Sequence, residues 1–259
     1  MMVISEKING MFKKVGRCID NRDVAGLQEI VYANVDVGAN ALDINTGPGR
    51  DTAEEDIVWM VRTVQEVTDL PLSIDAPKAS VLKAGVEACT NPIIINSIPA
   101  EGERMTTLYP IAADHDATVI CLTFSEKEGI NLTADRRAEL AMLHLATAME
   151  FGIEPDRLMF DPLILPINCA QDQPQEVFAA LDMFKNLASP SPGSTVGLSN
   201  VSAGMKHRKL MNRTLLAMLC AHGLTSAIMD PFDEDLMAVA KTCEIMMNQK
   251  LYADDYLKA

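Results

Sequence analysis

The chain has 259 residues, of which 48% are hydrophobic, and its formal net charge at pH 7 is −14. This length suits one large α/β domain with a sizeable core, because roughly 250 residues is typical of an eight-stranded α/β barrel. An acidic chain is a poor partner for nucleic-acid phosphates or an anionic membrane surface, so we expect neither as a main binding target.

The predicted elements alternate along the chain. Apolar β-like runs lie near residues 2–5, 41–44, 71–74, 93–96, 118–123, 158–160, 195–198 and 226–229. Helix-like segments lie near residues 23–37, 52–68, 79–89, 102–114, 133–151, 174–187, 207–222 and 233–248. This alternation indicates a parallel sheet, and eight strands with eight helices favour a closed (β/α)8 TIM barrel over an open sheet. We expect a single barrel domain over residues 1–259.

Two of the predicted helices begin after a residue that can cap them. Asp51 precedes one helix and Thr133 another, and either side chain can accept the first unpaired backbone N–H groups. The helix after Thr133 has residues at three- and four-residue steps that predict a stripe packed on the barrel: Leu140, Leu143, Ala146, Thr147 and Phe151.

Several classes of site and location are not expected. The six cysteines include no Cys-x-x-Cys pair and the four histidines no His-x-x-x-His spacing, which argues against a disulfide framework or a metal site. The N-terminus lacks the pattern of a signal peptide, and no run approaches the about 20 apolar residues of a membrane span. These features predict a cytoplasmic protein.

Polar residues close most of the apolar runs. The segments ALDIN, LSID, IIIN, LMFD, VGLSN and AIMD end in Asp or Asn, and the residues concerned are Asp43, Asn45, Asp75, Asn96, Asp161, Asn200 and Asp230. A turn or a helix cap explains most single residues of this kind. Capping does not require the same residue types at so many strand tips, so we interpret the set as one polar pocket at the C-terminal ends of the strands. For Asp43, Asn45 and Asp230 the turn remains an equal alternative.

The chemistry of such a pocket is limited by what the chain lacks. We find no nucleophile elbow, Ser-His-Asp order, phosphate loop or dinucleotide fingerprint. A carboxylate can accept two parallel N–H donors from an aminopyrimidinone ring, and a carboxamide can serve both donor and acceptor edges. The strand-end residues therefore indicate a pocket that binds a pterin.

Several sequence blocks carry a resemblance to a known family. In chain order they are ISEKING from Ile4, ALDIN followed by Gly47 and Pro48, SID ending at Asp75, INS with Ala100 and Glu101, DPLILP from Asp161, GLSNVS from Gly197, and NRT from Asn212. With these blocks the chain resembles the pterin-binding methyltransferases that exchange a methyl group between tetrahydrofolate and a corrinoid protein. The methyltetrahydrofolate:corrinoid/iron–sulfur protein methyltransferase of acetogens belongs to that group.

The resemblance implies a role for each strand-end residue. Asp75, Asn96 and Asp161 match positions that hold the pterin ring, with Asp43 and Asn45 beside them, and Asn200 matches the catalytic residue near N5. Possible supporting residues are Glu6, Asn9, Ser97, Ser199 and Ser202. The family fold is a (β/α)8 barrel, usually a homodimer. The substrate would be tetrahydrofolate or 5-methyltetrahydrofolate.

The corrinoid (cobalamin) is expected on a separate partner protein. The chain has no Asp-x-His-x-x-Gly segment of the kind that ligates cobalt, and the predicted barrel uses the whole chain. Two other functions remain open, a dihydropteroate synthase-like pterin enzyme and a non-catalytic folate-binding subunit. Direction of transfer, corrinoid partner and original methyl donor are also open.

Three features depart from the pattern of the family. After Asp75 the chain reads Ala76, Pro77 and Lys78, where a hydroxyl residue is common. Lys7 stands where Arg is common, and a lysine cannot form the bidentate fork of a guanidinium. The segment 203–209 is unusually basic for this chain. It could contact the corrinoid protein or the glutamates of a folate, or it could be a solvated loop.

Overall fold

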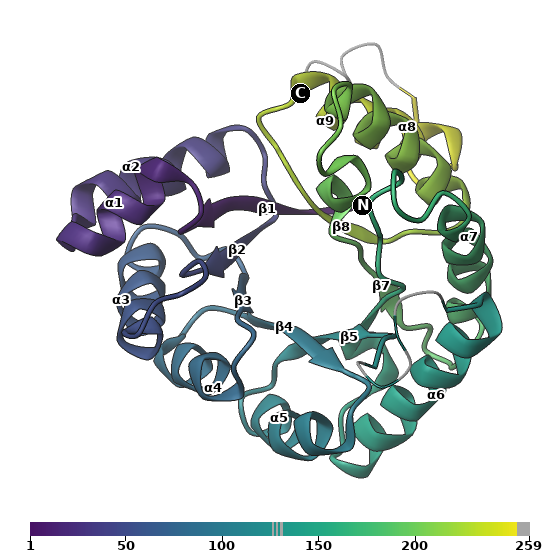
Figure 1. The fold of residues 1–259 in the computed structure, drawn as a ribbon, viewed down its shortest axis with the longest axis horizontal. Helices are drawn as coiled ribbons and strands as arrows, with labels where there is room; N and C mark the ends of the chain where they lie inside the picture. The colour runs from purple at the N-terminus through teal and green to yellow at the C-terminus, as the bar shows by residue number, and fades with distance from the viewer. Residues whose placement is uncertain (126, 128, 130–131, 253–259) are drawn as a thin grey trace.

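Eight parallel strands form a ring at the centre of the molecule (Figure 1). The computed structural model describes residues 1–125, 127, 129 and 132–252. The strands are β1 (Met2–Asn9), β2 (Ala41–Asn45), β3 (Leu72–Asp75), β4 (Ile93–Pro99), β5 (Thr118–Leu122), β6 (Leu158–Asp161), β7 (Gly193–Ser194) and β8 (Ser226–Met229). Each pairs with its neighbour in chain order, and β1 also pairs with β8. A bridge between Gly197 and Ile228 joins the β7 segment to β8.

Helices surround this ring, as Figure 1 shows. They are α1 (Lys13–Asn21), α2 (Val24–Asp36), α3 (Ala53–Gln65), α4 (Ala79–Ala88), α5 (Gly102–Asp114), α6 (Ala134–Glu150), α7 (Gln173–Phe184), α8 (Arg208–Ala221) and α9 (Glu234–Met246). Two short 3₁₀ helices, η1 (Pro155–Arg157) and η2 (Leu198–Ser202), interrupt the loops. The predicted (β/α)8 barrel is therefore confirmed. No helix in the described part of the chain has the length and apolar character needed to cross a bilayer.

The predicted elements differ from the structure at two places. Helix α1 was not predicted, because its polar sequence hides a short apolar face of Val15, Cys18 and Ile19. The seventh strand was placed at 195–198, but β7 covers Gly193–Ser194 and the later residues turn into η2. The apolar run continues past the end of the strand, so hydrophobicity alone does not locate that end.

The prediction for the long helix α6 was correct at its start and wrong for its buried face. The Thr133 side chain accepts the Arg136 N–H at 3.2 Å, as expected for a cap. At α3 the N-cap position belongs to Thr52 rather than Asp51, and the Thr52 side chain accepts no backbone N–H among the described residues. Leu140 is buried as predicted, but Leu143 and Phe151 are exposed, and the buried face also includes Arg137 and His144. These two polar residues are hydrogen-bonded inside the protein, which a hydrophobic pattern does not reveal: Arg137 to the Pro162 carbonyl at 2.7 Å, and His144 to Tyr109 at 2.7 Å.

Two apolar layers support the barrel. The larger one lies between strands and helices and includes Leu42, Ile44, Ile74 and Ile95. The smaller one is a separate cluster formed by alternate residues of the strands: Ile4, Ala41, Ile94, Ile120 and Met159, with Ile228 against it. Because successive side chains of a strand point to opposite faces, the smaller cluster fills the barrel interior. It provides the apolar floor below the mouth.

Candidate active site at the barrel mouth

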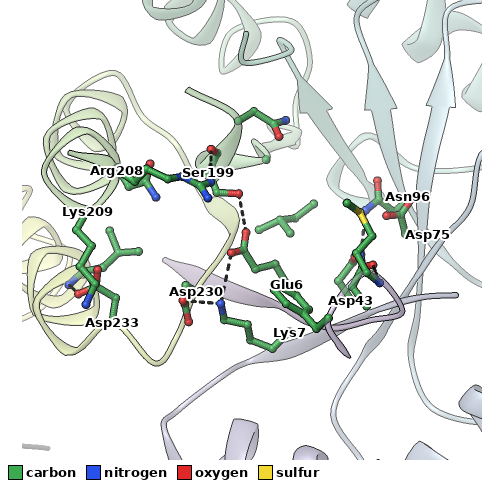
Figure 2. A pocket seen from close by; sticks show the side chains of 18 of the residues that line it. Glu6, Lys7, Asp43, Asp75, Asn96, Ser199, Arg208, Lys209, Asp230 and Asp233 are labelled. Atoms are coloured by element: carbon green, nitrogen blue, oxygen red, sulfur yellow. Dashed lines mark hydrogen bonds and ion pairs between the residues drawn. The ribbon is translucent and has the colours of Figure 1, made fainter. Parts of the chain in front are cut away.

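A cavity of about 710 Å³ lies above this floor, at the C-terminal ends of the strands (Figure 2). In five places, a residue that lines the cavity follows two positions after a residue of the apolar floor, which is one period of the strand pleat. The pairs, floor first, are Ile4 and Glu6, Ala41 and Asp43, Ile94 and Asn96, Met159 and Asp161, and Ile228 and Asp230. Since the side-chain period of a strand is two, each such pair points to the same side of the sheet. This alternation explains why so many apolar runs in the sequence end in a polar residue.

Asp43 lies deepest among the acidic side chains and is held by two neutral donors. The Ser73 hydroxyl donates to its Oδ1 at 2.6 Å and the Asn96 carboxamide at 2.9 Å. Burial raises the pKa of Asp43 well above its ordinary value, the charge of nearby Asp75 adds to the rise, and the two hydrogen bonds oppose it. The carboxyl of Asp43 is thus protonated more readily than an exposed one, and its Oδ1 fixes the carboxamide of Asn96.

Asp75 is oriented by Asn45 from the neighbouring strand. The two residues are register partners across β2 and β3, and the Asn45 carboxamide nitrogen donates to Asp75 Oδ2 at 2.6 Å. The oxygen of the same carboxamide accepts the Gly47 N–H at 2.7 Å, which fixes the orientation of the group. Asn45 therefore lies beside the cavity-lining residues, while Asp75 lines the cavity itself. Burial raises the pKa of Asp75.

Asp161 forms the opposite acidic wall, at the end of β6. Its Oδ1 accepts the Leu163 N–H at 2.8 Å, and no lysine or arginine forms an ion pair with it in the described residues. Burial raises the pKa of Asp161 to about 7, against the lowering effects of the Leu163 N–H and the charge of Arg137. At neutral pH this carboxyl can accordingly accept a hydrogen bond or donate one.

On the β1 side of the cavity, the cation of Lys7 lies between the carboxylates of Glu6 and Asp230. An irregularity in the β1–β2 register between Ser5 and Ile8 lets the consecutive residues Glu6 and Lys7 both line the cavity. Lys7 Nζ is 2.5 Å from Asp230 Oδ2, and it is 3.8 Å from Glu6 Oε1 (Figure 2). Asp230, to which the sequence assigned no role, is thus the partner of Lys7.

Asn200 lies in the helix η2, which corrects the expectation that it ends a strand. Its side chain is exposed and lines the cavity, and its carboxamide has no hydrogen bond within the described structure. A Cβ atom at Gly197 would stand 2.9 Å from Asn200 Nδ2, so the absence of a side chain at Gly197 makes room for the carboxamide.

The helix η2 is held from both sides. The Ser199 hydroxyl donates to Glu6 Oε2 at 2.9 Å. From the other side the Arg208 guanidinium donates to the Ser202 hydroxyl at 3.1 Å and to the Ser199 carbonyl at 3.3 Å. Burial raises the pKa of Glu6, while the bond from Ser199 opposes the rise. These contacts fix the backbone that carries Asn200.

The remaining supporting residues divide between two cavities. Asn9 lines the main cavity, and Ser202 is buried at the end of η2. Ser97 lines a neighbouring cavity of about 330 Å³ that shares Asp75 with the main one. A second register irregularity, in β4 after Asn96, turns these adjacent residues toward different cavities.

The sequence indicated the basic segment 203–209 and the block from Asn212, but it did not place them in one wall of the cavity with Asp233. Arg208, Lys209, Asn212 and Asp233 line the cavity from the helices α8 and α9. The NRT block from Asn212 belonged to the family resemblance, but nothing in the block showed that Asn212 faces the cavity. Among the described residues no cluster of His, Cys, Asp and Glu is suited to hold a metal ion.

Comparisons with known proteins agree with this geometry. A model of the pterin binding enzyme family matches residues 14–230. The chain is 30% identical over 261 residues to a methylcorrinoid:tetrahydrofolate methyltransferase of Eubacterium limosum, with 100% of this chain and 96% of that protein covered.

The chain is also similar to more distant proteins. Methionine synthases of Mycobacterium leprae and Mycobacterium tuberculosis are 26% and 28% identical over 88% of this chain. The chain spans only 20% of the length of either synthase. Among solved structures, Rv1207 of Mycobacterium tuberculosis superposes with a TM-score of 0.65 at 17% identity, covering 97% of this chain and 94% of that one, which supports the fold.

The family match covers most of the barrel, and its strands carry the acidic and carboxamide groups that suit a pterin ring. The chain belongs to the pterin-binding enzyme family.

Proposed function

We propose that this protein moves a methyl group between N5 of tetrahydrofolate and the cobalt of a corrinoid carried by a separate protein. The observation that carries the proposal is one cavity lined together by Asp43, Asp75, Asn96, Asp161 and Asn200. A relative with 30% identity over the full chain is a methylcorrinoid:tetrahydrofolate methyltransferase, which supports the same reaction here.

We assign pterin binding to the acidic side of the cavity. Asp75 and Asp161 would contact N–H groups of the ring, and the Asn96 carboxamide, fixed by Asp43 at 2.9 Å, would contact its edge. Asn45 supports Asp75 from below. A flat heterocycle rich in N–H donors suits these groups because they can accept hydrogen bonds. The raised pKa values of Asp75 and Asp161 reflect the burial of acids that form no ion pair among the described residues.

We assign the chemical step to Asn200. In the forward direction the methyl carbon leaves N5 and bonds to cobalt; Co(I) supplies the new electron pair, the old pair stays on N5, and N5 gains a proton. In reverse, the N5 lone pair attacks the methyl group, the bonding pair returns to cobalt as Co(I), and the proton on N5 is released. A tertiary amine is a poor leaving group, so a contact that strengthens as N5 becomes protonated lowers the barrier more than it tightens binding. The unpaired carboxamide of Asn200 on a fixed backbone fits that role.

We place the corrinoid on a partner that docks over the open barrel mouth. The exposed apolar side chains Met11 and Phe12 lie at the edge of the cavity and are available for such a contact. We also propose a homodimer. It is supported by the exposed apolar side chains Met142, Leu143 and Met149 on the outer face of α6, and light scattering of the purified protein tests it.

A single set of assays separates this function from its two alternatives. The purified protein is mixed anaerobically with 5-methyltetrahydrofolate and cob(I)alamin, and methylcobalamin formation is followed by absorbance. We expect transfer. A dihydropteroate synthase would instead condense a pterin pyrophosphate with p-aminobenzoate, and a binding subunit would titrate tetrahydrofolate without transferring the methyl group.

A further inference from the structure

The α8 side of the cavity carries two cations, Arg208 and Lys209, whose charges act on Glu6 and Asp233 without forming an ion pair with either in the described part of the chain. Arg208 and Lys209 are exposed and line the cavity at the start of α8. Arg208 donates only to neutral groups, the hydroxyl of Ser202 and the carbonyl of Ser199. Neither cation, nor the exposed Lys206 just before them, forms an ion pair within the described ranges of the chain.

The acids nearest to these cations already have other partners. Asp230 is held by Lys7 at 2.5 Å and Asp233 by Arg213 at 2.5 Å. The first turn of α8 contains no acidic residue, so its positive end adds to the local potential. On a chain with a net charge of −14, this wall is a local site of positive charge that is open to a ligand.

The place where the glutamate tail is attached to a folate directs that tail toward this wall. The carbon that bears the p-aminobenzoyl-glutamate tail is bonded to N5, at the far end of the ring system from the aminopyrimidinone edge. If Asp75 and Asn96 hold that edge and Asn200 faces N5, the tail leaves the ring on the η2 side. Figure 2 shows Asp75 and Asn96 on one side of the cavity and Arg208 and Lys209 on the other.

We propose that Arg208 and Lys209, with Lys206 beside them, form a subsite for the carboxylates of the glutamate tail, and that the protein prefers folates with several γ-linked glutamates. This inference rests on the proposed function. Each added glutamate brings one more carboxylate to a wall whose cations form no ion pair among the described residues, and such contacts weaken as salt screens them.

Binding of tetrahydrofolate with one, three and five glutamates to the full chain, measured by anaerobic calorimetry, tests the subsite. We expect the triglutamate to bind about tenfold more tightly than the monoglutamate at low salt, and the difference to shrink as ionic strength rises. Lys209→Glu should remove most of that difference. The matched control is Lys78→Glu, an equal charge change at an exposed residue in the loop after β3, on the same face of the barrel but outside the cavity.

Three results would overturn the subsite. The first is equal affinity for all tail lengths. The second is an equal effect of Lys209→Glu and Lys78→Glu, which would indicate only the general field of the protein. The third is a Lys209→Glu variant that keeps the length preference but transfers methyl groups poorly to a corrinoid protein while serving free cob(I)alamin normally, because the basic wall would then be a protein-docking surface.

The same measurements distinguish this inference from the proposed function. Affinity that increases with tail length, without any methyl transfer, supports the subsite and contradicts the methyltransferase. Transfer with no dependence on tail length supports the methyltransferase and overturns the subsite. Absence of tetrahydrofolate binding at every tail length overturns both.

Discussion

The two sides of the cavity use the same residue types in opposite ways. On the β2–β6 side, Asp43, Asp75 and Asp161 are contacted by carboxamides, a hydroxyl or a backbone N–H, and none has a cationic partner in the described structure. On the β1–β8 side, Asp230 is paired with Lys7 and Asp233 with Arg213.

The pKa values follow this difference. Burial raises the pKa of Asp43, Asp75 and Asp161. Burial also acts upward on Asp233, but the hydrogen bond and charge of Arg213 outweigh it and lower the pKa of that residue. An acid without a cation keeps its hydrogen-bonding capacity for a ligand, whereas a paired acid mainly holds the wall in place. The predictions below probe this division, from the largest expected effect to the smallest.

Asn200→Ala should separate chemistry from binding. We expect the turnover for methyl transfer to fall about 100-fold, the scale seen when a preorganised transition-state contact is removed, while tetrahydrofolate affinity changes less than about threefold. Stopped-flow transfer and calorimetry measure the two quantities. Unchanged turnover with only a raised KM would show that Asn200 binds substrate and does not act on the reaction.

Asp75→Ala should affect binding more strongly than the matched change Asp230→Ala. Loss of a buried hydrogen-bond acceptor costs about 1.5–3 kcal/mol, so Asp75→Ala should weaken tetrahydrofolate binding about tenfold to 100-fold. Asp230→Ala should leave affinity within about threefold and lower the melting temperature, because Lys7 loses its partner. Equal losses of affinity in the two variants would remove the functional difference between the two walls.

Gly197→Ala tests whether Asn200 must occupy its present place. The backbone at Gly197 has a φ of −76°, which any residue adopts, but the new Cβ would stand 2.9 Å from Asn200 Nδ2. We expect turnover to fall about fivefold to tenfold with little change in melting temperature, because the new Cβ displaces only the Asn200 side chain. Gly102→Ala is the control, since its Cβ would meet no atom within 4 Å. A loss shared by both variants would point to a general effect of the substitution.

Asp161 should make the ligand-free protein less stable as pH rises. Its pKa is about 7 in the folded state against an ordinary value of 3.8, so the folded state binds more protons between these limits and loses stability as pH rises through them. His144, whose pKa burial lowers from 6.5 to about 4, acts in the opposite direction over its own range. The difference between wild type and Asp161→Asn isolates the first group. Thermal melts from pH 4 to 8 should show a smaller decline in the variant, and parallel curves would contradict the raised pKa.

The sequence predicted the barrel and the acidic wall for one physical reason. Alternation along a buried parallel strand places an apolar floor residue and a polar mouth residue two positions apart, as in Ala41 and Asp43 or Met159 and Asp161. Such pairs can be recognised in the amino-acid sequence without the structure. The same reasoning therefore located both the strands and the groups that line the cavity.

Other features depend on partners that are distant in the sequence. Nothing local distinguishes Asp230, which forms an ion pair with Lys7 from the far end of the chain, from Asp161, which forms no ion pair among the described residues. The irregularity that turns Glu6 and Lys7 to the same cavity is a property of strand pairing. The position of Asn200 in η2 likewise depends on contacts with Glu6 and Arg208 through neighbouring serines.

The central claim is most directly tested by a single turnover. Protein loaded with one equivalent of 5-methyltetrahydrofolate, labelled on the methyl group, is mixed anaerobically with excess cob(I)alamin, and the label is followed into methylcobalamin. The cavity and its carboxamide predict transfer of one methyl group per active site, far faster than without protein. Tight folate binding with no label in the cobalamin would contradict a methyltransferase at this barrel mouth.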